Sequence, residues 1–383
     1  MIFILWNSAR TLPYLPIYGL DAARDAVIWG YAIFSFILLL VLPPLAYKNF
    51  IHFLRNAILL WLGWGIAGFV ITHYFQFNPL LQSFQKGLFL IRVADYGMPL
   101  AGIAIFLSLR MDVDINQKFQ PQTLLLLWGL WLINFLIAAT DSRAALLSSG
   151  IGLLPLLIFY PKKVGRLLQL IWVLLLLVFI FILASFSGQD SINAQGFKRE
   201  ISIQQLQQNI LSIIPTLGKD SVGNAILVQN RDWRLAWWSD IVTKISQPEY
   251  FIQGQGYGIN LALDYKRTTA SRTDPLRSPH NVFMTFLARS GYPGLFLWFL
   301  LLIMIFYRLG SSFLLLPPTS PKARILIFYF FFILSYLINA SFGVVIEGPM
   351  GGIWFWGLIG LGLGYAYSIQ SPSPYKPELE RIR

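Results

Sequence analysis

The sequence of 383 residues contains no cysteine, and only 12% of its residues are charged. Without cysteine, a disulfide framework, a thiolate nucleophile and a thiolate metal site are all excluded. A soluble domain usually carries about 25% charged residues, so the polar surface here is too small to enclose a water-soluble globule. Since 56% of the residues are hydrophobic, in runs long enough to cross a bilayer, the chain is predicted to be a polytopic membrane protein.

Motifs of several enzyme classes are also missing. The glycine-rich stretch Gly254–Gly258 is not followed by Gly-Lys-Ser/Thr, so it predicts a tight turn and not a nucleotide P-loop. No Gly-x-Ser-x-Gly elbow supports a serine triad around His280, and no histidine pair has metal-ligand spacing. We therefore expect neither a cofactor nor a bound metal.

The net charge of +12 comes from basic residues that lie in short clusters between hydrophobic runs. This pattern is typical of cytoplasmic loops and not of nucleic-acid binding.

The hydrophobic runs predict an all-α fold with about nine transmembrane helices. The predicted spans are 26–46, 57–77, 88–109, 123–139, 144–160, 167–186, 282–309, 324–346 and 349–369. The seventh is interrupted at Gly291–Gly294, which predicts a short half-helix after His280 before the span proper. A long polar segment, Ser187–Pro279, separates the sixth span from the seventh.

This pattern divides the chain into four parts. They are N-terminal transmembrane helices (1–121), helices bearing a Ser-Arg motif (122–186), a long loop (187–280) that is expected to be extracytoplasmic and catalytic on the grounds given below, and C-terminal helices with a short cytoplasmic tail (281–383). With an odd number of spans the N-terminus lies outside, which a further weak helix near Leu12–Leu20, or a start site placed too late, would explain.

The distribution of basic residues predicts the orientation of the helices. One set of alternate loops holds thirteen Lys and Arg, whereas the short loops of the other set hold only Lys86 and Arg143. The thirteen are Lys48, Arg55, Arg110, Lys118, Lys162, Lys163, Arg166, Arg308, Lys322, Arg324, Lys376, Arg381 and Arg383. Because the strongly basic face is cytoplasmic, the long polar segment and Arg143 are predicted to lie outside.

Five polar residues far apart in sequence then share the outer face: Arg143, Arg231, Arg234, His280 and Glu347. The unperturbed pKa of histidine, about 6.5, suits proton exchange at neutral pH, although a lone interfacial histidine is more often structural. Asn281 can cap the following helix and fix the approach of the His280 ring.

Each arginine allows two interpretations. Arg143 stands at a helix start, where the macrodipole disfavours a cation, so it either reaches lipid headgroups or binds an anion such as phosphate. Arg231 and Arg234 are one helical turn apart and point the same way if the segment is helical. With tryptophans interleaved, that helix either lies in the membrane interface with solvated charges or presents both guanidiniums to a ligand. Glu347 closes the eighth span and is equally ambiguous.

Four blocks of sequence carry a resemblance to a known family. They are Thr140–Leu147, Arg231–Trp238, Pro248–Gly258 and Pro279–Leu287, the last followed by Gly291–Leu295. In order and spacing they resemble the O-antigen ligase and polymerase superfamily of bacterial envelope enzymes, over about residues 122–369. Members usually have ten to twelve spans, so the N-terminal part of this chain is abbreviated by comparison.

The resemblance implies a GT-C-like fold and a metal-independent glycosyltransferase in the bacterial inner membrane, with its active site facing the periplasm. The implied reaction moves a glycan from a polyprenyl-diphosphate carrier to a glycan or lipid acceptor, in lipopolysaccharide or exopolysaccharide synthesis. His280 is then the general base, while Arg143 and Arg234 hold the diphosphate with support from Arg231. Asn281 and Glu347 position the substrate. The aromatic-rich spans form the groove for the prenyl chain, and ligase and polymerase remain equally open.

Two other hypotheses stay open on the sequence alone. A transporter of a small anion such as bicarbonate predicts ionisable residues near the midplane of several spans, and apart from Arg92 and Asp95 almost none is recognised. A non-enzymatic assembly partner predicts that Arg143, Arg234 and His280 can be replaced together without harm.

Overall fold

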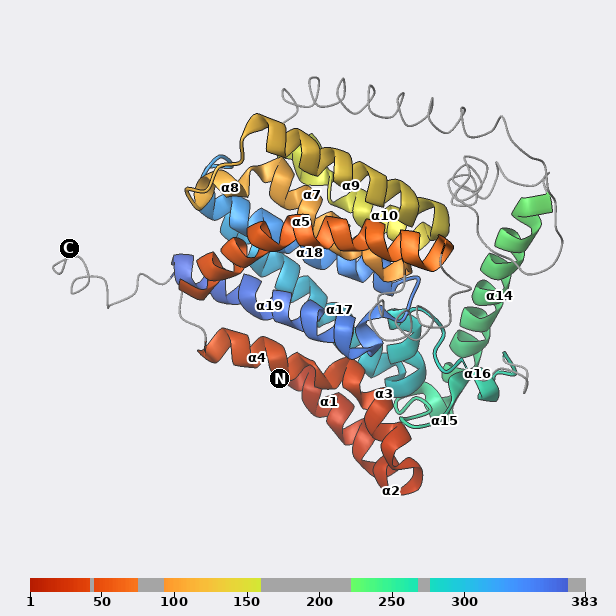
Figure 1. Cartoon of the computed structure of the whole chain (residues 1–383). Helices are drawn as coiled ribbons and strands as arrows, with labels where there is room; N and C mark the ends of the chain where they lie inside the picture. The colour runs from red at the N-terminus through yellow and green to blue at the C-terminus, as the bar shows by residue number, and fades with distance from the viewer. Residues whose placement is uncertain (42–44, 75–92, 160–221, 268–275, 371–383) are drawn as a thin grey trace. The chain divides into compact units, whose positions relative to one another are not determined.

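A computed structural model describes five stretches of the chain. They are residues 1–41, 45–74, 93–159, 222–267 and 276–370. Every regular element in these stretches is a helix (Figure 1). The chain divides into two compact units, each treated by itself below: residues 1–50 with 229–383, and residues 51–228.

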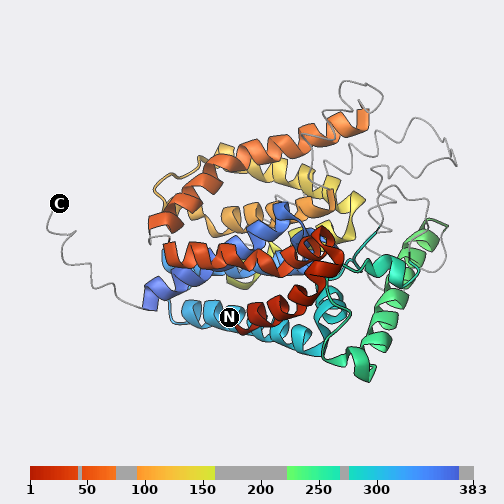
Figure 2. The same cartoon turned by 90° about the horizontal axis from the view of Figure 1, so that it is seen from below.

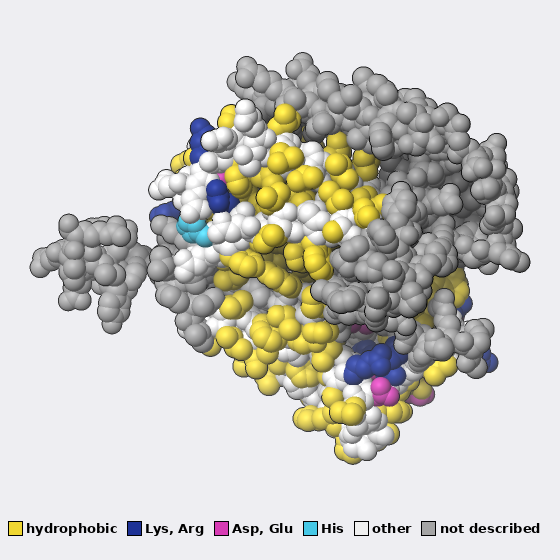
Figure 3. Space-filling model, in the orientation of Figure 1, with side chains coloured by type: hydrophobic (Ala, Val, Ile, Leu, Met, Phe, Trp, Pro, Cys, Tyr) yellow, Lys and Arg dark blue, Asp and Glu magenta, His cyan; other side chains and the backbone are white. Residues whose placement is uncertain are grey.

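Five described helices are long and apolar enough to cross a membrane, and a bent pair counts as a sixth if it is one span. They are Asn49–Val70, Pro121–Thr140, Val282–Leu314, Pro321–Ala340 and Pro349–Ile369, with the pair Leu20–Gly30 and Ala32–Leu40 bent by 44°. The side chains visible over the helices in Figure 3 are mostly hydrophobic, as a lipid-facing surface requires. The chain is therefore a multi-spanning membrane protein.

The predicted count of about nine spans is not reached among the described residues. The sixth predicted span, 167–186, lies outside them. The fifth, 144–160, is divided between α10 (Arg143–Ile151) and α11 (Leu154–Phe159), separated at Gly152. A helix of 9 residues rises only about 14 Å, less than half of the roughly 30 Å hydrocarbon core, so neither piece spans alone.

The N-terminus holds more helix than the sequence analysis assigned. Helix α1 (Ile2–Thr11) is followed by η1 (Leu12–Tyr14), α2 (Leu15–Tyr18), α3 (Leu20–Gly30) and α4 (Ala32–Val41). The segment near Leu12–Leu20 is thus helical in pieces of 3 and 4 residues, too short to be the further membrane-spanning helix that the topology called for. The first predicted span, 26–46, begins within α3, after its last charged residue Asp25, and continues into α4.

The first unit is built on three long helices. They are α17 (Val282–Leu314), α18 (Pro321–Ala340) and α19 (Pro349–Gln370). Helix α1 packs against α17, and α4 lies along α19, as Figures 1 and 2 both show. The Ser35 hydroxyl donates to the carbonyl oxygen of Trp356, and a Cβ at Gly360 would lie 2.6 Å from the Ser35 carbonyl. Glycine therefore allows α4 and α19 to approach closely.

An aromatic cluster joins the N-terminal helix to the long helices. The Phe3 ring lies 5.3 Å from Phe286 and 5.5 Å from Trp298, measured between centroids. Trp356 continues the cluster at 5.9 Å from Trp298. These side chains are almost fully buried, and aromatic pairs contribute about 0.5–1.5 kcal/mol beyond the area they bury. The N-terminal segment is thus part of the core of this unit.

Helix α17 begins with a half-helix, as the sequence predicted. The helical geometry breaks at Gly291, whose φ is 68° and ψ −171°. Pro293 follows two residues later and has no N–H to donate, so the break falls where the helical hydrogen bonds are interrupted. Helix α18 ends at Ala340, before the predicted Ile346, and a loop then leads to η2 (Val345–Glu347).

Three further helices belong to the polar region of the first unit. They are α14 (Val222–Ile245), counted here from Gln229, α15 (Pro248–Phe251) and α16 (Leu261–Asp264). Trp237, Ile241 and Ile245 of α14 are buried against Leu261 and Leu287. This apolar face fixes α14 to the half-helix of α17.

The second unit packs α7 (Val93–Leu109) against α9 (Pro121–Asp141) and α10. The Trp131 indole donates to the Leu100 carbonyl at 2.7 Å. A Cβ added at Gly97 would lie 2.6 Å from the Cα of Ala145. This close backbone approach between α7 and α10 holds the start of α10, where Arg143 stands.

Candidate functional site

The turn before α17 carries His280 in an uncommon backbone conformation. Its φ of 54° lies in the left-handed region, which few residues other than glycine adopt. Ser278 and Asn281 on either side are buried, whereas His280 is half-buried. The Asn281 side chain caps α17, accepting from the backbone N–H of Phe283 at 2.9 Å and of Met284 at 3.2 Å. The predicted cap is confirmed, and it sets the direction in which the turn enters the helix.

Helix α14 touches this turn through one of its faces. The Trp238 indole donates to the carbonyl oxygen of Pro279 at 2.9 Å. One turn earlier, Nη1 of Arg234 donates to the carbonyl oxygen of Phe342 at 2.8 Å, in the loop after α18. Since residues four apart share a helix face, this face of α14 meets both loops. Arg234 is thereby held beside the segment that leads to Glu347.

The other predicted features of α14 have mixed outcomes. The segment is helical, the condition under which Arg231 and Arg234 were expected to share a face, and the Arg231 guanidinium pairs with the Asp232 carboxylate at 2.9 Å. The interleaved tryptophans do not all face headgroups. Trp237 is fully buried, and the Trp233 ring packs edge-on against it at 5.3 Å. Both therefore stabilise the protein core.

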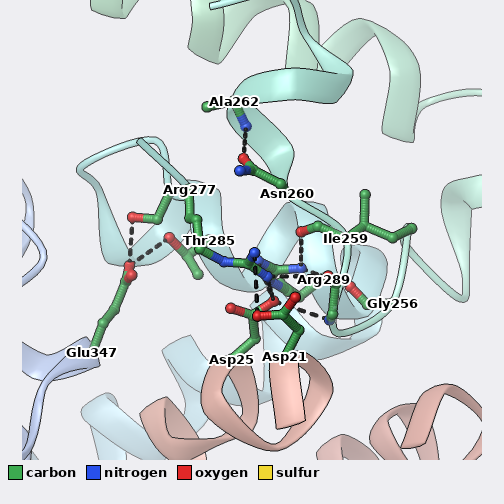
Figure 4. Close-up of polar contacts among 12 residues, drawn as sticks. Asp21, Asp25, Gly256, Ile259, Asn260, Ala262, Arg277, Thr285, Arg289 and Glu347 are labelled. Carbon is green, nitrogen blue, oxygen red and sulfur yellow. Dashed lines mark hydrogen bonds and ion pairs between the residues drawn. The ribbon is translucent and has the colours of Figure 1, made fainter. Parts of the chain in front are cut away.

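The Glu347 carboxylate binds both sides of the His280 turn. Its Oε1 accepts from the Ser278 hydroxyl at 2.9 Å and from the Thr285 hydroxyl at 3.0 Å (Figure 4). Burial raises the pKa of Glu347 to about 7, although the hydrogen bonds from Ser278 and Thr285 act in the opposite direction. This glutamate is thus in direct contact with the segment that bears the histidine.

The Gly254–Gly258 stretch is the predicted tight turn, and its three glycines all have positive φ. The backbone N–H of Gln255 donates to the Ala288 carbonyl at 2.7 Å, and that of Gly256 to the Arg289 carbonyl at 3.1 Å. The Arg289 carbonyl would otherwise face Pro293, which has no N–H. The turn therefore provides hydrogen-bond donors for the backbone carbonyl groups at the break in α17.

A buried ionic cluster, which was not predicted from the sequence, holds this turn from the other side. The Asp25 carboxylate of α3 lies 2.8 Å from the Arg289 guanidinium and 3.1 Å from that of Arg277. Asp25 also accepts from the Gly258 N–H at 2.9 Å. Arg289 donates in addition to the carbonyl oxygens of Gly256 and Ile259 (Figure 4). An arginine inside an apolar predicted span was the signal available, because such a charge is costly and needs a partner.

The N-terminal helix contributes a second buried contact to the same turn. Oδ1 of Asn7 accepts from the Tyr257 hydroxyl at 2.8 Å and from the Ser290 hydroxyl at 2.6 Å. Burial raises the pKa of Tyr257, so its hydroxyl keeps the proton that it donates. Helices α1 and α3 together therefore clamp the glycine turn onto the His280 half-helix.

Arg143 belongs to the second unit. It is the first residue of α10, as predicted, and is half-buried. The preceding Ser142 caps the helix, its hydroxyl oxygen accepting from the Ala145 N–H at 3.4 Å. Within the first unit, the elements bearing Arg234, His280 and Glu347 meet directly. The meeting of Arg143 with these three stays a prediction.

Comparison with known proteins gives one match. A family model described as O-antigen ligase matches residues 128–299, slightly less than half of the chain. This match confirms the resemblance to the O-antigen ligase and polymerase superfamily. It includes Arg143, Arg231, Arg234, His280 and Asn281, whereas Glu347 lies beyond its end. No curated protein and no solved structure matches the chain.

Proposed function

We propose that this membrane protein of the O-antigen ligase type transfers a glycan from a polyprenyl-diphosphate carrier to a sugar hydroxyl on the periplasmic side of the inner membrane. The observation that carries the proposal is the joining of three elements around His280. Trp238 of α14 bonds to the His280 turn, Arg234 bonds to the loop before η2, and Glu347 of η2 bonds back to that turn. The family match provides the reaction class.

The proposed chemistry needs a base and a site for negative charge. The acceptor oxygen forms a bond to the anomeric carbon of the donor sugar while the bond from that carbon to the diphosphate oxygen breaks. A neutral His280 imidazole takes the acceptor proton and later loses it to solvent, a contribution of roughly 10²–10⁴-fold to the rate. The leaving polyprenyl diphosphate gains charge as the bond breaks.

Guanidinium groups aimed at the diphosphate stabilise the transition state more than the ground state. We assign this role to Arg234 and Arg143, with Arg231 in support. Arginine suits it because its planar fork binds phosphate oxygens in pairs. In this proposal the arginines take the developing charge, a task that a metal ion performs in other transferases. The aromatic-rich helices receive the prenyl chain.

The test is glycan transfer by the full chain in lipid nanodiscs, with a synthetic polyprenyl-diphosphate glycan as donor. Wild-type protein is expected to release polyprenyl diphosphate together with elongated or acceptor-linked glycan, and His280→Ala to release neither. His52→Ala, in α5 (Leu45–Tyr74), is the matched control and should retain transfer. Equal transfer by His280→Ala and wild type would refute the assigned base.

The product distinguishes the two branches of the superfamily. A polymerase yields a ladder of longer glycans on the carrier, whereas a ligase yields glycan on a separate lipid acceptor. The family match does not favour the alternative of a small-anion transporter. Labelled bicarbonate uptake into vesicles should accordingly be no greater than in protein-free vesicles.

A further inference from the structure

Two hydroxyl groups that bracket His280 in the sequence donate to the same carboxylate oxygen. Ser278 precedes the histidine by two residues and Thr285 follows it by five, and their hydroxyls lie 2.9 and 3.0 Å from Oε1 of Glu347. The Thr285 hydroxyl is also 3.0 Å from the Asn281 carbonyl oxygen, but an ionised carboxylate is the stronger acceptor of its single hydrogen. The donors are themselves buried. A single acceptor therefore ties the entry of the turn to the first helical turn of α17, with His280 between them.

The turn requires a stabilising contact of this kind because its backbone adopts an unfavourable conformation. The positive φ of His280 costs free energy for a residue with a side chain, and it persists only where surrounding contacts impose it. The Trp238–Pro279 bond holds one side, and the Asn281 cap acts only on the helix that follows. Glu347 connects the two sides.

Glu347 is well placed to impose this geometry because η2 is itself held firmly. A Cβ added at Gly351 would lie 2.1 Å from the Val345 carbonyl oxygen, so the start of α19 packs directly on η2. Two further charges act on the pKa of Glu347: Arg289, one turn after Thr285 on α17, lowers it, and Asp25 raises it. Since Arg289 is paired with Asp25 at 2.8 Å, Glu347 keeps its oxygen for the two hydroxyls.

We propose that Glu347 is a positioning residue, which holds the turn so that the His280 imidazole faces the acceptor hydroxyl without itself binding the sugar. This inference rests on the proposed glycan transfer for its functional meaning. It replaces the substrate-binding role that the sequence suggested for Glu347. The amide of glutamine offers the same acceptor oxygen, whereas alanine offers none.

Transfer kinetics separate positioning from binding. Glu347→Ala is expected to lower kcat about 10–100-fold, as a small misplacement of a reacting group does, with KM for donor and acceptor within about twofold. Glu347→Gln should retain most of the activity. Thr285→Val and Ser278→Ala each remove one donor and should fall between, with less than additive loss when combined with Glu347→Ala. Glu249→Gln, at an exposed position on α15, is the control.

A second readout does not depend on transfer. In the full chain with His52→Gln and His73→Gln, the absorbance of carbethoxylated histidine formed with diethyl pyrocarbonate reports the reactivity of His280 alone. Glu347→Ala should change its rate of modification, and Glu347→Gln should leave that rate close to the reference. If wild-type protein transfers no glycan, the proposed function fails while this measurement still decides whether Glu347 holds the turn.

Three results would overturn the inference. One is unchanged His280 reactivity in a folded Glu347→Ala protein. The second is a rise in KM for the acceptor with kcat unchanged, which would make Glu347 a substrate-binding residue. The third is a Glu347→Gln protein as impaired as Glu347→Ala, since the acceptor oxygen would then not be what matters.

Discussion

The backbone N–H of Gly256 donates to the carbonyl oxygen of Arg289 at 3.1 Å, where Pro293 leaves that carbonyl without its usual helical donor. The glycine-rich turn and the proline break are separate signals in the sequence. In the structure they form one feature, because the turn provides the hydrogen bond that the proline cannot donate. The turn stabilises the end of the half-helix that begins at His280. Anything that displaces it should disturb the histidine.

Gly291→Ala tests this feature. Its positive φ of 68° is unfavourable for alanine, and the new Cβ would lie 2.6 Å from the Ile252 carbonyl oxygen. We expect a loss of at least about 1–2 kcal/mol of stability and a lower melting temperature in detergent. Gly310→Ala, with no atom closer than 3.9 Å to the added Cβ, is the control in the same helix. Equal melting temperatures for the two variants would contradict the account.

The Asp25 and Asp21 carboxylates allow a comparison of buried and exposed ion pairs. Asp25 is 8% exposed and lies 2.8 Å from Arg289, whereas Asp21 is 51% exposed and lies 3.4 Å from Arg277. Asp25→Ala leaves a buried guanidinium without its partner, a loss of about 3–5 kcal/mol. Asp21→Ala should cost less than about 1 kcal/mol. Thermal unfolding of both variants checks this order, which similar melting temperatures would refute.

Glu347 should make stability depend on pH. An ordinary glutamate has a pKa of about 4.3, and burial raises that of Glu347 to about 7. The folded state then binds the proton more tightly than the unfolded state. The contribution of Glu347 is thus fully present below about pH 4.3 and is lost as pH rises toward about 7. The stability of Glu347→Gln should not fall between about pH 4.3 and about pH 7. The difference in melting temperature, Glu347→Gln minus wild type, should therefore increase over this pH range. A constant difference would argue against the raised pKa.

Substitution by lysine should reduce glycan transfer more at Arg234 than at Arg231. Arg234 bonds to the Phe342 carbonyl between two functional loops, whereas Arg231 pairs with its neighbour Asp232. If Arg234 holds the diphosphate, Arg234→Lys should reduce transfer about 100-fold, because lysine lacks the planar fork. Arg231→Lys should reduce it less. The same nanodisc assay measures both, and the opposite order would reassign the diphosphate contact.

Local signals in the sequence predicted local structure well. Gly291 and Pro293 marked the break in α17, and the position of Asn281 marked its cap, since backbone freedom and capping depend on adjacent residues. The bounds of α19 also followed from its apolar run. The division of 144–160 into two helices was missed, although Gly152 and Pro155 lie at that point.

Long-range contacts were beyond those signals. The pairing of Asp25 with Arg289 and the bond from Glu347 to Ser278 join residues with no periodic relation in the chain. Asp25 stands directly before the first predicted span, 26–46, and nothing local indicates that it faces α17. The predicted topology placed Glu347 and His280 on the same outer face. The hydroxyls of Ser278 and Thr285, which connect Glu347 to the His280 turn, could be identified only in the three-dimensional structure.

The central proposal is that Arg143 and His280 act on the same lipid-linked sugar. Since the chain has no native cysteine, the double variant Arg143→Cys with His280→Cys tests it without background. A short bis-maleimide should join the two cysteines within one chain. Arg143→Cys with Lys322→Cys, predicted on the cytoplasmic face, should not be joined. Failure to join the first pair while each cysteine reacts singly would contradict the shared site.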